Sequence, residues 1–131
     1  MVGVIFLFVK KTDKGNNTDY IEFQICKSNL DEKIESLIKV PNISFNAESS
    51  LYLDFVDYEK FLKEYGTYFN NGVHSNLEEG QLDPYGVNYF SLDKTMKIIE
   101  LISKDKPFEF EKIITFLLDA IDNNGFYVLG I

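Results

Sequence analysis

The sequence predicts an α+β fold: a single domain over residues 1–131 in which a small, mostly antiparallel sheet of about four strands packs with about four helices. The first observation behind this prediction is length, because 131 residues are typical of one domain that buries its own core. The second is an apolar content of 45%, which is ordinary for a globular protein. The third is the order of the elements: strand, strand, helix and strand come first, several helices follow, and a strand ends the sequence.

The first two strands are predicted from their apolar patterns. Residues 2–10 are apolar on both faces and rich in Val, Ile and Phe, which predicts a buried, central strand. Residues 12–19 have the composition of a turn, and residues 20–27 alternate polar and apolar side chains, which predicts a strand with one face in the core. We expect these two strands to pair as a hairpin. Cys26 lies on the polar side of the second strand, so we expect it to be partly exposed.

A helix and a third strand follow. Ser28 or Asn29 is the expected N-cap of the helix, and Pro41 ends it. Residues 43–45 are a candidate for a short edge strand. Residues 51–55 alternate again between apolar and polar side chains, which predicts a further strand.

The second half of the sequence is predicted to be mainly helical. A helix is expected over residues 58–69, and the most apolar helix over residues 109–122. Residues 71–90 are predicted to form a long loop, and loops of that length are usually functional or disordered. Residues 126–131 are almost entirely apolar, so we expect a last strand inside the sheet. A further helix is predicted over residues 92–103, with inward side chains from Leu92, Met96, Ile99 and Ile102.

No catalytic, cofactor or metal motif is present in the sequence. His74 is the only histidine and Cys26 the only cysteine, so neither a serine-histidine-aspartate set nor a zinc site is supported. The eight glycines are scattered and form no phosphate-binding loop. Glu78, Glu79 and Asp83 are close in sequence, but the spacing typical of a calcium loop is absent, so a solvated acidic loop is favoured over a carboxylate metal site. We therefore expect no enzyme and no cofactor, and an enzyme built on scattered carboxylates is kept only as a third interpretation.

The charge of the chain is uneven. Residues 1–47 hold six Lys and six acids, whereas residues 48–131 hold seven Lys and fifteen acids and therefore carry the whole net charge of −8. All thirteen basic residues are Lys, so there is no Arg for bidentate recognition of phosphate. This balance argues against direct nucleic-acid binding. The longest apolar run, residues 4–9, is too short to span a membrane, and no basic leader precedes it, so a cytoplasmic protein without membrane contact is expected.

Residues 64–93 suggest a binding surface. They contain no Lys, five acids, and seven aromatic rings when the imidazole of His74 is counted. Tyr supplies a large contact area at little entropic cost, and carboxylates around it attract a basic partner. The alternative is that residues 83–86 form a plain turn and that the aromatic side chains after it fold into the core. The predicted partner-binding residues are Glu64, Glu78, Glu79, Asp83, Tyr85, Tyr89 and Asp93.

Taken as a type, the chain resembles the immunity proteins of bacterial polymorphic-toxin and contact-dependent growth-inhibition systems. It is small, acidic, rich in Lys but free of Arg, and without enzyme motifs. At the level of sequence, the resemblance rests on two segments, D-P-Y-G-V-N-Y-F (83–90) and N-N-G-F-Y-V-L-G-I (123–131). Such proteins share no single fold, so the resemblance transfers no functional residue.

The resemblance implies a protein that binds and neutralises one cognate toxin domain, often a nuclease, which is basic because it must hold phosphate. An acidic surface would place carboxylates where the phosphates sit. The alternative is a small interaction or self-associating regulatory module without enzymatic activity. That alternative predicts a homo-oligomer formed through the apolar edge of a terminal strand.

Overall fold

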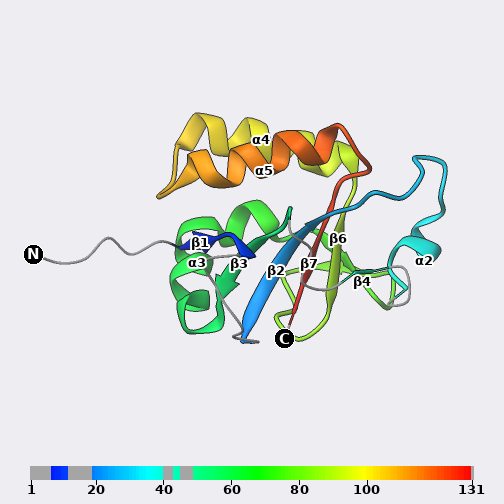
Figure 1. Ribbon diagram of the computed structural model, residues 1–131, viewed down its shortest axis with the longest axis horizontal. Coiled ribbons are helices and arrows are strands. Elements are labelled where there is room, and N and C mark those ends of the chain that lie inside the picture. The colour runs from blue at the N-terminus through cyan, green and yellow to red at the C-terminus, as the bar shows by residue number, and fades with distance from the viewer. Residues whose placement is uncertain (1–6, 12–18, 40–42, 45–48, 131) are drawn as a thin grey trace, which may run out of the picture.

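The computed structural model describes residues 7–11, 19–39, 43–44 and 49–130, and Figure 1 shows the arrangement. The described elements form an α+β fold around one seven-stranded sheet with the order β1-β3-β2-β7-β6-β4-β5, in which every pairing is antiparallel. The predicted fold class is therefore confirmed. The strands are β1 (Phe8–Val9), β2 (Tyr20–Ile25), β3 (Leu51–Asp54), β4 (Gly72–His74), β5 (Glu79–Gly80), β6 (Val87–Phe90) and β7 (Phe126–Leu129).

The α-helices cover both faces of the sheet unequally. Three of them and two short 3-10 turns pack against one face, and Figure 1 shows α4 and α5 side by side above the strands. A single turn of helix lies against the other face. The helical elements are α2 (Ile34–Leu37), η2 (Phe55–Asp57), α3 (Tyr58–Tyr65), η3 (Gly66–Phe69), α4 (Leu92–Asp105) and α5 (Phe110–Ile121).

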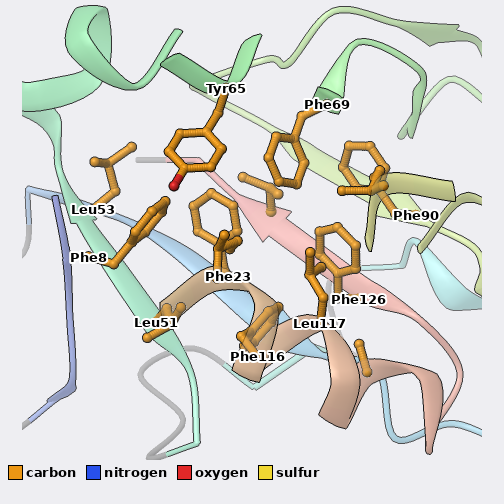
Figure 2. Packing of buried hydrophobic residues seen from close by; sticks show 14 of the residues in the cluster. Phe8, Phe23, Leu51, Leu53, Tyr65, Phe69, Phe90, Phe116, Leu117 and Phe126 are labelled. Atoms are coloured by element: carbon orange, nitrogen blue, oxygen red, sulfur yellow. The ribbon is translucent and has the colours of Figure 1, made fainter. Parts of the chain in front are cut away.

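The main core is an aromatic cluster between the sheet and the larger helical layer. The ring of Phe23 on β2 makes edge-to-face contacts with Phe8, Phe61, Phe69 and Phe116, at centroid distances of 5.6–6.3 Å. Figure 2 shows Phe8, Phe23, Phe69 and Phe116 converging from the sheet, η3 and α5. Aromatic pairs in this geometry are more favourable than their buried area alone indicates.

The second face of the sheet is also buried, and this corrects the prediction for Cys26. Cys26 is fully buried rather than partly exposed, because α2 and Ile43 cover that face together with Tyr89 and Tyr127. The polar positions of β2 are buried as well. Glu22 accepts hydrogen bonds from Ser50 Oγ (2.8 Å) and Gln24 Nε2 (3.0 Å), so these polar groups are satisfied inside the fold.

The position of the first strand differs from the prediction. β1 lies at an edge of the sheet and pairs with β3 (Phe8↔Leu53), not with β2. The predicted hairpin is therefore wrong. The physical reason is that β2 uses one edge for β3 and the other for β7, so neither edge is left for β1. The apolar residues 2–6 of the predicted strand lie outside the described part of the chain.

The predicted loop over residues 71–90 is the largest correction to the fold. It contains β4, β5 and β6, each only two to four residues long. Strands of that length show too few alternations to be recognised from sequence. Their presence raises the strand count from about four to seven, and it makes this segment an ordered part of the sheet.

Smaller differences concern the helices. The first helix is a single turn that begins after Lys33, not at Ser28 or Asn29, and Ile43 and Ser44 belong to no strand. In α4, Met96 is 58% exposed, whereas Thr95 and Ile98 are buried. Thr95 can occupy an inward position because its hydroxyl donates to the Ser91 carbonyl (2.7 Å). Phe45, the end of the predicted edge strand, lies outside the described residues.

The last strand agrees with the prediction. β7 lies inside the sheet, between β2 and β6, and both of its edges are paired. It therefore offers no open edge to a second copy of the chain.

Buried tyrosines predict a loss of stability at alkaline pH. Burial, the largest cause, raises the pKa values of Tyr65, Tyr89 and Tyr127, and burial with the Asp105 hydrogen bond raises that of Tyr68 to about 12. Each folded-state pKa exceeds the ordinary value of 10.0, so this contribution to stability is complete below about pH 10 and is lost as the pH rises through the folded values. We expect the free energy of unfolding in urea to fall steadily above about pH 10.

The matched control for this prediction is Tyr68→Phe, which keeps the ring and removes the hydroxyl that donates to Asp105 Oδ2 (2.7 Å). This variant should lose less stability between about pH 10 and pH 12 than the parent protein. A free energy of unfolding that stays constant over that range would contradict the prediction.

Candidate functional site

The most informative part of the predicted surface is the tight turn between β5 and β6. The Asp83 carboxylate accepts a hydrogen bond from the Tyr85 N–H (3.0 Å), and the Gly86 N–H donates to the Asp83 carbonyl (3.4 Å). This is an Asx-type turn, in which the side chain itself fixes the backbone. A Cβ at position 86 would lie 2.5 Å from the Asp83 carboxylate, so only glycine fits there without a shift.

A buried amide holds this turn on the sheet. The Asn88 side-chain oxygen accepts from the Asp83 N–H (2.9 Å), and its NH2 group donates to the carbonyls of Asp83 (3.0 Å) and Val128 (3.0 Å). The Gly130 N–H also donates to the Gly86 carbonyl (2.8 Å), and a Cβ at position 130 would collide with the Pro84 carbonyl. The turn is therefore fixed by β6 and by the end of β7. Asn88 was not among the predicted site residues.

Tyr85 of this turn belongs to a group of aromatic and apolar side chains that we call the aromatic platform. We define the platform as Phe55, Val56, Tyr58 and Tyr85. The Tyr85 ring lies 5.9 Å from Phe55, which stacks on Tyr58 at 5.7 Å with an interplanar angle of 5°. Tyr85 is 68% exposed and Val56 is 83% exposed. The platform joins η2 and the start of α3 to a turn about thirty residues later in the chain.

Carboxylates surround the aromatic platform. Burial raises the pKa of Tyr58, and the nearby Asp83 carboxylate and Tyr85 raise it further. Asp54 and Asp57 enclose Phe55 and Val56 in the sequence, and after burial they raise the pKa of Tyr20. Asp54, Asp57 and Asp83 form no ion pair with another described residue. We call these three side chains the acidic rim.

A groove of about 320 Å³ continues from the platform. It runs between the α3–η3 segment and the chain that follows β5. Leu62, which is 41% exposed, and Leu82 supply apolar contacts there. The full lining is Tyr58, Leu62, Gly66, Thr67, Asn70, Gln81 and Leu82.

The other predicted acids form a separate surface at the β4–β5 hairpin, which we call the hairpin surface. Glu79 is paired with Lys94 of α4, whose ammonium group also donates to the Asn71 carbonyl (2.7 Å). Glu78 and Asp93 are both exposed beside this pair. The ion pair with Lys94 neutralises part of the negative charge, so the hairpin surface is a weaker attractor for a cation than its sequence suggests.

Two predicted residues do not join either surface. Tyr89 is only 2% exposed, and its hydroxyl donates to the Asn124 carbonyl (2.7 Å), so the expectation that it faces a partner is wrong. Its position in β6 turns it toward Tyr127 on the α2 face of the sheet. Glu64 lies on α3 two residues after Leu62, which turns it by roughly 200° away from the groove.

The structure thus brings Asp83 and Tyr85 together with residues that sequence analysis assigned only to a strand and to the start of a helix. The signal for them was present in the sequence D-F-V-D-Y (54–58), which places two acids among three large apolar side chains. Nothing in the sequence indicates that this segment and residues 83–86 meet, because their contact depends on the sheet order.

The described residues indicate no metal-binding cluster. In the described ranges, no group of three or more His, Cys, Asp and Glu side chains is placed to hold a metal ion. His74 Nε2 lies 2.8 Å from the Gln81 carbonyl, which assigns the proton to that nitrogen and gives it a structural partner. Within the same ranges, no helix has the length and apolar character needed to cross a bilayer.

In comparisons with known proteins, no family model, no curated protein and no solved structure matches this chain. Function is therefore inferred from the surface itself.

Proposed function

We propose that this protein is a cytoplasmic immunity protein that binds a cognate, basic toxin domain and neutralises it. The single observation that carries the proposal is the aromatic platform with its acidic rim, held on a rigid turn and without an ion pair among the described residues. Exposed apolar groups of this kind are typical of protein–protein contacts. The surrounding carboxylates favour a cationic partner.

The overall charge supports the same function. The chain carries a net charge of −8, all of it in residues 48–131, which include both acidic surfaces. A nuclease domain must be cationic to hold phosphate, so an acidic inhibitor is attracted to it over a distance and associates quickly.

The test of the proposed function is capture of a partner followed by a protection assay. The tagged protein is incubated with lysate from the native organism at low and at high salt, and the bound proteins are identified by mass spectrometry. We expect one basic protein in equimolar amount, captured less efficiently at high salt. That protein should be toxic when expressed alone and harmless when it is co-expressed with this chain. Recovery of the chain alone would overturn the proposal in favour of a self-associating module.

Neutralising the predicted acids should slow association with the captured toxin. In the variant Glu78→Gln/Asp83→Asn/Asp93→Asn, we expect the association rate constant at low salt to fall roughly tenfold, because electrostatic steering contributes about 10- to 1000-fold. The amides preserve shape, and an Asn at position 83 can still accept the Tyr85 N–H bond, so the fold should be unchanged. Stopped-flow kinetics at several salt concentrations measures the effect.

The matched control is Glu100→Gln/Asp105→Asn/Asp119→Asn, which changes the charge equally at exposed positions of α4 and α5. It should leave the association rate nearly unchanged. An equal fall in both variants would show that only net charge matters, and an unchanged rate in the first variant would remove these acids from the binding surface.

A further inference from the structure

We propose that the aromatic platform, its acidic rim and the adjoining groove form a docking surface for an arginine-bearing, partly apolar segment of the partner protein. The kind of partner rests on the proposed function. The inference goes beyond it by choosing one of the two acidic surfaces and by specifying the chemistry of the segment that binds there.

The first step is the exposure of apolar groups at one place. Val56, Leu62 and Tyr85 are 83%, 41% and 68% exposed, although scattered exposed apolar residues elsewhere on the protein need no explanation. Leu62 lines a groove of about 320 Å³ together with Leu82 and Tyr58, and Tyr58 connects this groove through the Phe55 ring to Tyr85. An apolar side chain of the partner would gain by burying this surface.

The second step is the combination of ring faces with carboxylates. Tyr85 follows Asp83 by two residues in the fixed turn, and Phe55, which stacks on Tyr58, directly follows Asp54, whose carboxylate accepts the Val56 N–H (3.1 Å). A guanidinium group stacks on an aromatic face while it donates two parallel hydrogen bonds to a carboxylate, and a lysine ammonium group does this less well. The platform and its rim therefore favour arginine.

The third step excludes the hairpin surface and a second copy of this chain. Glu79 of the hairpin surface is already paired with Lys94, whereas the described residues form no ion pair with Asp54, Asp57 or Asp83. A symmetric dimer through the platform would place the acidic rim of one copy against that of the other. Like charges at an interface are unfavourable, so a cationic segment of a different protein is the better occupant.

The test uses synthetic peptide probes and the intact protein, and the toxin itself is not required. The probes are the acetylated, amidated peptides Leu-Arg-Gly-Leu-Arg and Leu-Glu-Gly-Leu-Glu, titrated into labelled protein while amide NMR shifts are recorded. We expect the arginine peptide, and not the glutamate peptide, to shift the amides of Val56, Leu62 and Tyr85. The apparent affinity should fall about tenfold in Asp57→Asn/Asp83→Asn and again in Tyr85→Ala.

The control variant Glu78→Gln/Asp93→Asn changes the charge by the same amount on the hairpin surface and should retain the affinity of the parent protein. Urea unfolding of each variant establishes that the fold is retained before its affinity is compared. Shift changes confined to residues 74–80, equal losses in the two double variants, or a dimer that forms through the platform without peptide would each overturn the docking inference.

The docking inference and the proposed function can fail separately. A captured toxin that binds the Asp57→Asn/Asp83→Asn variant with parent affinity would overturn the docking surface and leave the immunity function standing. Binding of the arginine peptide at the platform, together with a protein that protects against no captured partner, would support the docking surface and overturn the immunity function.

Discussion

Replacing Asn88 with alanine is expected to lower the free energy of unfolding by about 3 kcal/mol, because it removes buried hydrogen bonds and leaves their partners unpaired. The Asn88 side chain accepts a hydrogen bond from the Asp83 N–H and donates to the carbonyls of Asp83 and Val128, at distances of 2.9–3.0 Å. The residue is fully buried. Since the same amide holds the turn that carries Tyr85, partner binding should weaken even where the protein remains folded. Urea unfolding measures the first effect, and the affinity for the captured toxin measures the second.

Asn76→Ala supplies the matched control. Asn76 is an exposed asparagine of the β4–β5 hairpin, and its side chain makes only local bonds: it accepts from the Glu78 N–H (3.0 Å) and donates to Glu78 Oε2 (3.4 Å). Its replacement should cost no more than about 1 kcal/mol. If both substitutions have the same small effect, the Asn88 side chain does not hold the turn.

Replacing Phe23 with alanine should have a still larger effect on stability, about 3–5 kcal/mol, because it opens a cavity at the centre of the aromatic core. Phe23 is fully buried, and the centroid of its ring lies 5.6–6.3 Å from the centroids of four other Phe rings, three of which are labelled in Figure 2. A loss of that size is a large fraction of the stability of a domain of this length. Equilibrium unfolding in urea is the measurement, and thermal unfolding provides an independent estimate.

Phe108→Ala is the control for this substitution. Phe108 is partly exposed, and its ring contacts the Lys60 ammonium group at 4.5 Å. Its backbone carbonyl, which accepts the Tyr65 hydroxyl, is retained in the variant. The loss should therefore be about 1 kcal/mol or less. A loss at position 23 no larger than that at position 108 would mean that the core relaxes around the missing ring.

Much of the fold follows from local patterns in the sequence. The alternation of residues 20–25 and 51–54 predicts β2 and β3, and the apolar periodicity of α5 predicts the helix that covers them. The apolar end of the chain predicts β7 inside the sheet, because an exposed strand of that composition would be unstable in water. These features depend on neighbouring residues only, so they can be recognised without the fold.

The sequence alone was less informative where each element is short. β4, β5 and β6 hold two to four residues each, and turn residues separate them, so a loop was the natural prediction for residues 71–90. Only β6 pairs with β7, which comes about forty residues later, and β4 and β5 are then added beside β6. The displacement of β1 to the edge has the same origin, because the pairing of β2 with β7 is decided far along the chain.

Some features of the candidate site also follow from local sequence, whereas others depend on the tertiary structure. The sequence by itself determined the charge, the acidic and aromatic composition of residues 64–93, and the turn at Asp83–Gly86, because composition and turn chemistry are local. Only the tertiary structure decided that Tyr89 is buried, that Lys94 neutralises Glu79, and that Tyr85 meets Phe55 beside Asp54 and Asp57. The physical reason is that each of these facts is a contact between segments far apart in the chain, and the order of the strands sets those contacts.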